Sequence, residues 1–347
     1  YTLRPMGNSI VSRLVVGGVC LGLSAGVGFA QSHAGAATKA SLLVVNQVDR
    51  NISIVDPVTG HEVATIPENV PELHAHEAAA SPDGRTGYFP IYGNTGVGHP
   101  GLNGRSMLVV DLASRKLVGT VDFGHEVRPH CPVFDPNSGL LYVTTELDKT
   151  VTAINPKTLK IVATIPTGQE QSHMLALSSD GSRGYTANVG PGTVSVLDMK
   201  AHKTLAVIPI SKTTQRISVS RDDSMVFTAD QTQPRLAVID TATNKVKSWI
   251  ALPAVGYGTA STRDGRWLLV AMPKANAVAV VDLKSLKVVR TIAVPKAPQE
   301  VLARPDGKVA YVSSMATGQV AAIDLVGWKV ENVIVAGKGA DGLAWAK

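Results

Sequence analysis

The stretch 174-MLALSSDGSRGYTANVGPGTVSVLDMKAHKTLAVI-208 alternates apolar and polar residues in four short runs separated by Gly, Asp, Asn or Pro. These runs cover residues 174–178, 184–188, 194–197 and 205–208. Short runs with a period of two, rich in Val, Ile and Thr, are typical of antiparallel strands joined by tight turns. The stretch therefore predicts one unit of four antiparallel strands.

The same unit recurs along the chain at a nearly constant spacing. The turn pairs Asp180-Gly181, Asp222-Asp223, Asp264-Gly265 and Asp306-Gly307 stand 42 residues apart. A second marker is the polar residue that ends one run of each unit: Asp56, Asp111, Asn155, Asp198, Asp240, Asp282 and Asp324. Repeats of four short strands are the signature of propeller blades. The count predicts an all-β, seven-bladed β-propeller with four-stranded antiparallel blades.

The first repeat lacks its innermost strand. It supplies three runs, at residues 42–46, 52–56 and 62–66, whereas a lone run at residues 342–346 ends the chain. We expect the C-terminal strand to complete the N-terminal blade, because this closes the ring and leaves no unpaired edge between the first and last blades. Residues 37–347 are therefore expected to form a single propeller domain.

The segment before the first repeat has the features of a secretory signal. Residues 1–5 precede Met6, Arg13 supplies a positive charge, and an apolar run extends from Leu14 to Phe29. This run is shorter than the roughly 20 residues that a spanning helix needs. We expect residues 1–36 to be upstream residues followed by a cleaved signal peptide. The mature protein is then periplasmic or secreted and has no membrane span.

Charge and cysteine content argue against several protein classes. Once residues 1–36 are removed, 31 basic and 27 acidic side chains remain, and the basic residues are scattered without interleaved aromatics. Nucleic-acid binding is therefore not expected. Cys131 is then the one remaining cysteine, which excludes an intramolecular disulfide. We expect a monomer that is stabilised by its core and by ring closure.

The repeats resemble the YVTN-type β-propeller family, which is named for a second strand that reads Tyr-Val-Thr-Asn. Here this strand reads YTAN at 185–188, YVTT at 142–145 and YVSS at 311–314, and the adjoining run reads TVSVLD at 193–198. The resemblance covers nearly all of the mature chain and implies the propeller fold in an exported bacterial protein. It says little about chemistry, since similar rings serve as binding proteins, lactonases and redox enzymes.

One position of each repeat marks the start of the innermost strand, five residues before the first residue of the turn that contains the pair. Equivalent positions on the inner strands form a ring around the central channel: His76, His130, His173, Gln215, Tyr257, Gln299 and Asp341. Three consecutive blades thus place a histidine on one rim. The long insertion Gly93–Arg105, which carries His99, is expected on the same rim, and Arg128 and Glu146 nearby.

The aligned histidines have two interpretations. His76, His130 and His173, with His74 as an auxiliary, would hold one copper or zinc ion, the metals that imidazole-rich sites favour. Gln215, Tyr257, Gln299 and Asp341, with Arg128 and Glu146, would then bind ligand in the channel. In the alternative interpretation the channel is a wet polar funnel with no cofactor, and the histidines only hydrogen-bond water and backbone.

The predicted function is an exported binding protein with a ligand or metal site in the funnel, on the rim of blades two to four. Its partner would be a small molecule, a metal or another exported protein. The alternative is an enzyme that uses the same funnel, either a metal-dependent lactonase-type hydrolase or a copper-dependent redox enzyme. Binding is favoured because an enzyme would need a convincing acid or base beside its electrophile site. Only Glu77, Glu146 and Asp341 are available there for that role. A structural adhesive module is a third possibility.

Overall fold

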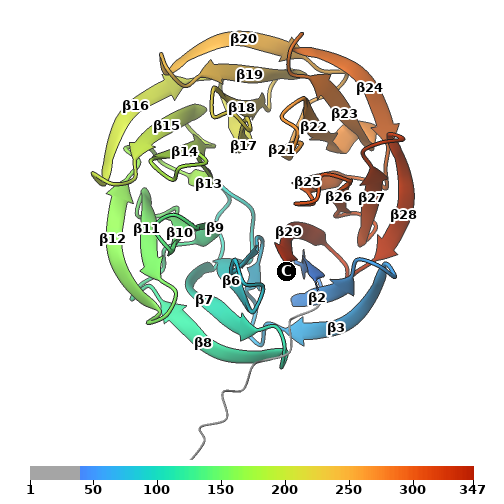
Figure 1. The fold of residues 1–347 in the computed structure, drawn as a ribbon. Helices are drawn as coiled ribbons and strands as arrows, with labels where there is room; N and C mark the ends of the chain where they lie inside the picture. The colour runs from blue at the N-terminus through green and yellow to red at the C-terminus, as the bar shows by residue number, and fades with distance from the viewer. Residues whose placement is uncertain (1–39) are drawn as a thin grey trace, which may run out of the picture. The chain divides into compact units, whose positions relative to one another are not determined.

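Strands of alternating Val, Ile, Leu and Thr form seven antiparallel sheets, which stand as blades around a central channel (Figure 1). The computed structural model describes residues 40–347, so the predicted signal segment 1–36 lies outside the described residues. In blades two to seven the strands run outward from the channel in sequence order, whereas blade one has the C-terminal strand innermost. The predicted fold class, an all-β propeller with seven four-stranded blades, is confirmed.

Blades one to four are built as follows. Blade one contains β29 (Ala340–Ala346), β1 (Ser41–Asn46), β2 (Asn51–Asp56) and β3 (His61–Pro67). Blade two contains β4 (His74–Ala75) and β5 (Ala79–Ala80), then β6 (Thr86–Gly93), β7 (Asn103–Asp111) and β8 (Lys116–Asp122). Blade three contains β9 (Pro129–Asp135), β10 (Leu140–Thr145), β11 (Thr150–Asn155) and β12 (Lys160–Pro166). Blade four contains β13 (Ser172–Leu177), β14 (Arg183–Asn188), β15 (Thr193–Asp198) and β16 (Lys203–Pro209).

The remaining blades repeat this plan. Blade five contains β17 (Thr214–Val219), β18 (Met225–Asp230), β19 (Arg235–Asp240) and β20 (Lys245–Ala251). Blade six contains β21 (Thr259–Ser261), β22 (Trp267–Met272), β23 (Ala277–Asp282) and β24 (Lys287–Ala293), with the 3₁₀ turn η1 (Pro273–Ala275). Blade seven contains β25 (Pro298–Ala303), β26 (Val309–Ser314), β27 (Gln319–Asp324) and β28 (Lys329–Val335). Residues 40–347 contain no helix long and apolar enough to cross a membrane.

The ring closes through the predicted pairing of the two chain ends. β29 is antiparallel to β1, with Leu42 opposite Trp345 and Val44 opposite Leu343. The side chain of Asn46 reinforces this closure, because its Oδ1 accepts a hydrogen bond from the Gly337 backbone N–H at 3.0 Å. The first and last blades therefore meet as a paired sheet and leave no exposed inner edge.

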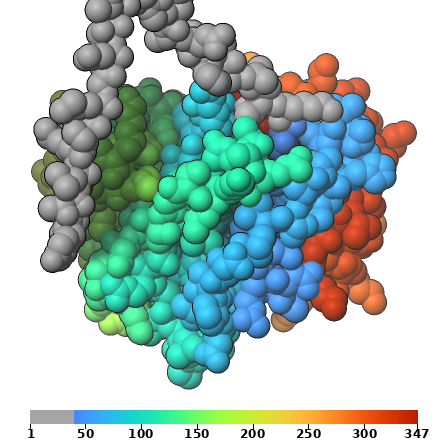
Figure 2. Space-filling view, turned by 90° about the horizontal axis from the view of Figure 1, so that it is seen from below, coloured from blue at the N-terminus to red at the C-terminus, as the bar shows by residue number. Residues whose placement is uncertain are grey.

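Apolar side chains fill the space between neighbouring blades. One buried cluster spans blades three to five, and another joins blade seven to blade one. The middle strands are almost fully buried, whereas the outer strands such as β8, β12 and β28 expose most of their residues. The edge view in Figure 2 shows the blades of the blue, cyan and green parts of the chain side by side.

The inner strands are irregular where they reach the channel rim. The pairing register shifts between Ser172 and Met174 in β13, and between Gln215 and Ser218 in β17. In blade two the inner strand is broken into β4 and β5, so His76 lies between two short strands. His74 and His76 therefore do not share one strand. Bulges of this kind let neighbouring residues such as Gln215 and Arg216 both reach the channel.

Deleting residues 341–347 should abolish cooperative unfolding, because the deletion leaves β1 unpaired at the channel and exposes the core between blades seven and one. Thermal denaturation followed by circular dichroism measures this. The control is Val326→Ala, at an exposed residue that follows β27 in blade seven, and it should leave the melting curve unchanged. A cooperative melt of the longer deletion at the wild-type temperature would show that ring closure does not depend on β29.

Candidate functional site

The predicted ring residues meet at one mouth of the channel, where they line a cavity of about 380 Å³. The inner strands begin at this mouth, and the insertion between β6 and β7 covers part of it. The ring residues that line the cavity are His76, His130, His173, Gln215, Tyr257, Gln299 and Asp341. The cavity is also lined by residues of the insertion between Asn94 and His99 and by Gln47, His74, Arg216 and Met315.

The three ring histidines form a cluster around one tyrosine. The rings of His130 and His173 are stacked, with centroids 3.6 Å apart, and the His76 ring meets that of His130 edge-on at 5.4 Å. The Tyr92 ring of β6 contacts all three, at 4.5 Å from His76, 5.0 Å from His130 and 5.5 Å from His173. His74 stacks on His76 at 4.9 Å, on the outer side of the cluster. Four histidines and a tyrosine thus form one aromatic wall.

This wall is not arranged as a preformed metal site. The planes of the stacked His130 and His173 rings are 29° apart, so their lone pairs, which lie in the ring planes, do not converge on one point. Across residues 40–347, no group of three or more His, Cys, Asp or Glu side chains has an arrangement that could hold a metal ion. The copper or zinc site therefore stays a prediction, and it requires at least one ring to turn.

Glu146 orients the inner side of the wall. Its Oε2 accepts a hydrogen bond from the Tyr92 hydroxyl at 2.6 Å and lies 3.2 Å from His173 Nδ1. Burial alone would raise the pKa of Glu146, but the hydrogen bonds from His173 and Tyr92 and the charge of Arg128 lower that pKa below its ordinary value. Because the carboxylate is ionised, His173 carries its proton on Nδ1. The other ring nitrogen, Nε2, is therefore left for a ligand or a proton.

Arg128 holds the insertion against this group. Its Nε donates to Asn103 Oδ1 at 2.6 Å, and its Nη2 donates to Thr95 Oγ1 and to the His99 carbonyl, both at 2.9 Å. Its Nη1 lies 3.9 Å from Glu146 Oε1. The side chain is buried and has a backbone φ of 49°, in the left-handed region. Arg128 therefore fixes the insertion over the funnel rather than offering a free charge to a ligand.

A second buried arginine forms the floor of the cavity. Arg216, from blade five, reaches across the channel and donates from Nη1 to Glu77 Oε1 of blade two. Its Nη2 donates to Asp341 Oδ1 of blade one at 3.1 Å, and Nη1 lies 3.7 Å from Glu300 Oε2 of blade seven. Its guanidinium also lies 5.0 Å from the Tyr257 ring. One side chain thus connects four blades across the channel.

The floor carries more carboxyl groups than cations, and burial controls their protonation. Burial raises the pKa of Asp341 to about 7, although Arg216 opposes the shift. Burial likewise raises the pKa of Glu300, and it raises that of Glu77 well above its ordinary value. Glu77 and Glu300 hydrogen-bond each other, which requires a proton between the two carboxyl groups.

Burial has the opposite effect on the histidines of the wall. Burial lowers the pKa of His76 and of His130 well below the ordinary value, and that of His74 less strongly. The neighbouring histidines and arginines lower the pKa values of His76 and His130 further. These imidazoles are therefore neutral at physiological pH, with a lone pair available on each ring. His76 Nε2, His130 Nδ1 and His74 Nδ1 have no hydrogen-bond partner within residues 40–347.

The structure brings eight of the ten predicted site residues to the cavity surface. Arg128 and Glu146 lie behind the wall instead, where they hold the insertion and His173. Sequence reasoning missed Tyr92, Arg216 and Glu300. Arg216 and Glu300 stand directly after the ring residues Gln215 and Gln299, and a charged residue at that position of an inner strand was the available signal. Nothing in the sequence pattern distinguished Tyr92.

Three other polar or thiol side chains have structural roles. Asn188 is buried and hydrogen-bonds Ser172, Thr193 and Ser195 within blade four. Asp240 accepts the backbone N–H of Thr243 and so caps a turn. Cys131 lies in a buried hydrophobic cluster, where burial raises the pKa of its thiol and leaves the thiol unreactive.

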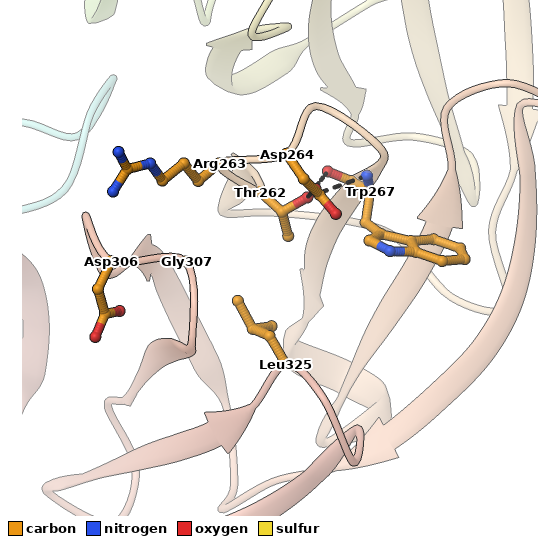
Figure 3. A pocket seen from close by; sticks show the side chains of 7 residues that line it. All are labelled: Thr262, Arg263, Asp264, Trp267, Asp306, Gly307 and Leu325. Atoms are coloured by element: carbon orange, nitrogen blue, oxygen red, sulfur yellow. Dashed lines mark hydrogen bonds between the residues drawn. The ribbon is translucent and has the colours of Figure 1, made fainter.

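A second hollow, of about 350 Å³, lies at the opposite ends of the inner strands, between blades six and seven (Figure 3). The polar residues of this hollow hydrogen-bond each other within the turn between β21 and β22. Thr262 Oγ1 donates to Asp264 Oδ1 at 2.5 Å, and the Trp267 backbone N–H donates to Thr262 Oγ1 at 3.1 Å. In Figure 3 the Arg263 side chain points away from the Trp267 indole. The same turn recurs in other blades, so this hollow reflects the repeat rather than a specialised site.

The sequence matches one known protein family. Residues 34–260 match the model of the family described as Lactonase, 7-bladed beta-propeller. No curated protein gives a significant match to the sequence. Among solved structures, hydrazine synthase of Kuenenia stuttgartiensis has a TM-score of 0.70 at 18% identity, over 82% of this chain and 92% of that chain.

Two further solved structures are similar to this chain. A functionally unknown protein from Desulfotomaculum acetoxidans has a TM-score of 0.73 at 14% identity, over 88% of this chain and 98% of that chain. The dihydro-heme d1 dehydrogenase NirN has a TM-score of 0.61 at 15% identity, over 87% of this chain and 74% of that chain. At these identities the structural matches establish the shared fold alone.

Proposed function

The chain belongs to the seven-bladed β-propeller lactonase family, and we propose that it is an exported binding protein whose funnel holds a small polar ligand or a metal ion. The funnel is the cavity between the histidine wall and the Arg216 floor. Fold similarity alone does not assign chemistry to a propeller, so the proposal rests on the residues of this site.

One observation carries the proposal: several buried polar atoms at this cavity have no hydrogen-bond partner among residues 40–347. They are His76 Nε2, His130 Nδ1, Gln215 Oε1 and Arg216 Nε, and all four side chains are more than nine-tenths buried. Buried polar groups in folded proteins are nearly always hydrogen-bonded. Such atoms on the surface of one cavity are the groups that a ligand or ordered water would satisfy.

A copper or zinc ion is the metal that this wall would favour. Neutral imidazoles bind such ions without first losing a proton, and His173 is supported from behind by Glu146 in the manner usual for metal-ligating histidines. His74 would be an auxiliary ligand. Gln215, Tyr257, Gln299 and Asp341 would contact a bound molecule, and Arg128 would act through the insertion.

Export is part of the same proposal. Residues 1–36 read as a signal segment and the strand motifs resemble the YVTN-type repeat, both of which are typical of periplasmic or secreted proteins. The partner is then a small molecule, a metal or another exported protein. We propose a monomer that does not bind nucleic acid.

Metal analysis of the mature protein, purified without a histidine tag, tests the metal-binding form of the proposal. We expect stoichiometric copper or zinc, lost in His130→Ala and in His173→Ala. Glu146→Gln should weaken the affinity by about 10- to 100-fold, because it removes the support of His173. The exposed His202→Ala is the control and should bind as the wild type does. A substoichiometric metal content that is the same in the wild type, His130→Ala and His173→Ala would exclude the metal site.

Lactone hydrolysis is the second candidate, favoured by the family match and by the Glu146–His173 pair. A carboxylate that fixes the tautomer of a histidine is the arrangement of a general base. His173 Nε2 would take a proton from water as the water oxygen bonds to the lactone carbonyl carbon. The ring C–O bond then breaks, and the proton passes to the leaving alkoxide.

A panel of lactones assayed with the mature protein tests this second candidate. If His173 is the base, His173→Ala should lower kcat by about 100-fold or more, while the circular dichroism spectrum stays unchanged. Glu146→Gln should lower kcat as well and shift the pH profile. Hydrolysis that survives His173→Ala at the wild-type rate would place the chemistry elsewhere.

A further inference from the structure

Neither arginine of the site offers a free charge to a ligand. Arg216 contacts three carboxyl groups, those of Glu77, Glu300 and Asp341, and its side chain is 5% exposed. Arg128 is engaged by Asn103, Thr95 and the His99 carbonyl and lies against Glu146. An anionic ligand would have to displace one of these partners from a buried position, which is costly.

Carboxyl groups outnumber guanidinium groups around the cavity. The two guanidinium groups, of Arg216 and Arg128, lie close to four carboxyl groups. These belong to Glu77, Glu300, Asp341 and Glu146. Asp341 lines the cavity directly, and its Oδ2 accepts a hydrogen bond from Gln47 Nε2 at 2.5 Å. Charges in a water-poor cleft act more strongly than they do at an exposed surface. Because Glu77 and Glu300 share a proton, the charges of the carboxyl groups about balance those of the two guanidinium groups. The funnel therefore has no excess positive charge that would attract an anion.

The unpartnered atoms of the cavity point to the same class of ligand. His76 Nε2, His130 Nδ1 and Gln215 Oε1 have no partner among the described residues, and each can accept a hydrogen bond or coordinate a cation. The unpartnered donor, Arg216 Nε, belongs to the guanidinium that already contacts three carboxyl groups. Electron-pair donors of the wall and the Asp341 carboxyl group of the floor thus face one cavity.

We propose that the funnel selects a positively charged group, carried either by a metal cation or by an organic ammonium, and excludes anions. This inference rests on the proposed function, because it takes the funnel as the ligand site. A metal cation would bind the imidazoles of the wall. An ammonium group would donate its hydrogen bonds to Asp341, Gln215 and the histidine nitrogens.

Crystals of the mature chain soaked in rubidium bromide test the sign of the charge, because both ions are located by anomalous scattering. We expect rubidium in the funnel near Asp341 and no bromide there. Bromide in the funnel, or neither ion in it, overturns the inference.

Calorimetric titrations separate the two sources of the charge. We expect benzylammonium or zinc to bind at least about tenfold more tightly than benzoate. Loss of zinc binding in His130→Ala would identify a metal cation as the ligand. Benzylammonium binding that falls about tenfold in Asp341→Asn would identify an ammonium. Glu300→Gln is a second variant in case Asp341→Asn does not fold, and Asp306→Asn, at the opposite ends of the inner strands, should change nothing.

Failure of this inference is distinguishable from failure of the proposed function. If benzoate binds in the funnel and is lost in His130→Ala, the funnel is a ligand site but its charge selectivity is wrong. If rubidium, zinc, benzylammonium and benzoate all fail to enter the funnel, both the inference and the proposed function are wrong.

Discussion

The buried contact between Arg216 and the carboxyl groups of Glu77, Glu300 and Asp341 is the constraint on which the funnel depends. The partners come from blades five, two, seven and one, so the interaction acts across the channel rather than within a sheet. Arg216 has a φ of 57° at a bulge in β17. A left-handed backbone conformation at a buried charged residue is costly and persists where the surroundings hold it in place.

The Arg216 floor separates two ends of the channel that differ in their side chains. Above Arg216 the side chains of blades two to four form an aromatic wall that contains four imidazoles, and Arg128 holds the insertion over the mouth. At the opposite ends of the inner strands the turns repeat a common design of Ser, Thr and Asp hydrogen bonds. The two ends of one repeated scaffold thus differ because three successive ring positions carry histidine.

Strand periodicity and the 42-residue spacing were sufficient to predict the blades, the ring closure and the ring of channel residues, because these follow from local alternation and repetition. The contacts of Arg216 could not be predicted. They join residues 139 and 125 positions apart, and they depend on a bulge that places Gln215 and Arg216 on the same cavity. The break between β4 and β5 was missed for the same reason, since no local pattern marks it.

A double-mutant cycle between Arg216 and Glu77 tests the cross-channel contact most directly. The free energy of unfolding is measured for the wild type, Arg216→Met, Glu77→Gln and the double variant. Direct contact across the channel predicts a coupling energy of about 1–3 kcal/mol, even though the two residues belong to different blades. If the effects of the two substitutions on the free energy of unfolding add to within about 0.5 kcal/mol, direct contact is contradicted. The interaction between Arg216 and Glu77 would then not stabilise the floor of the funnel.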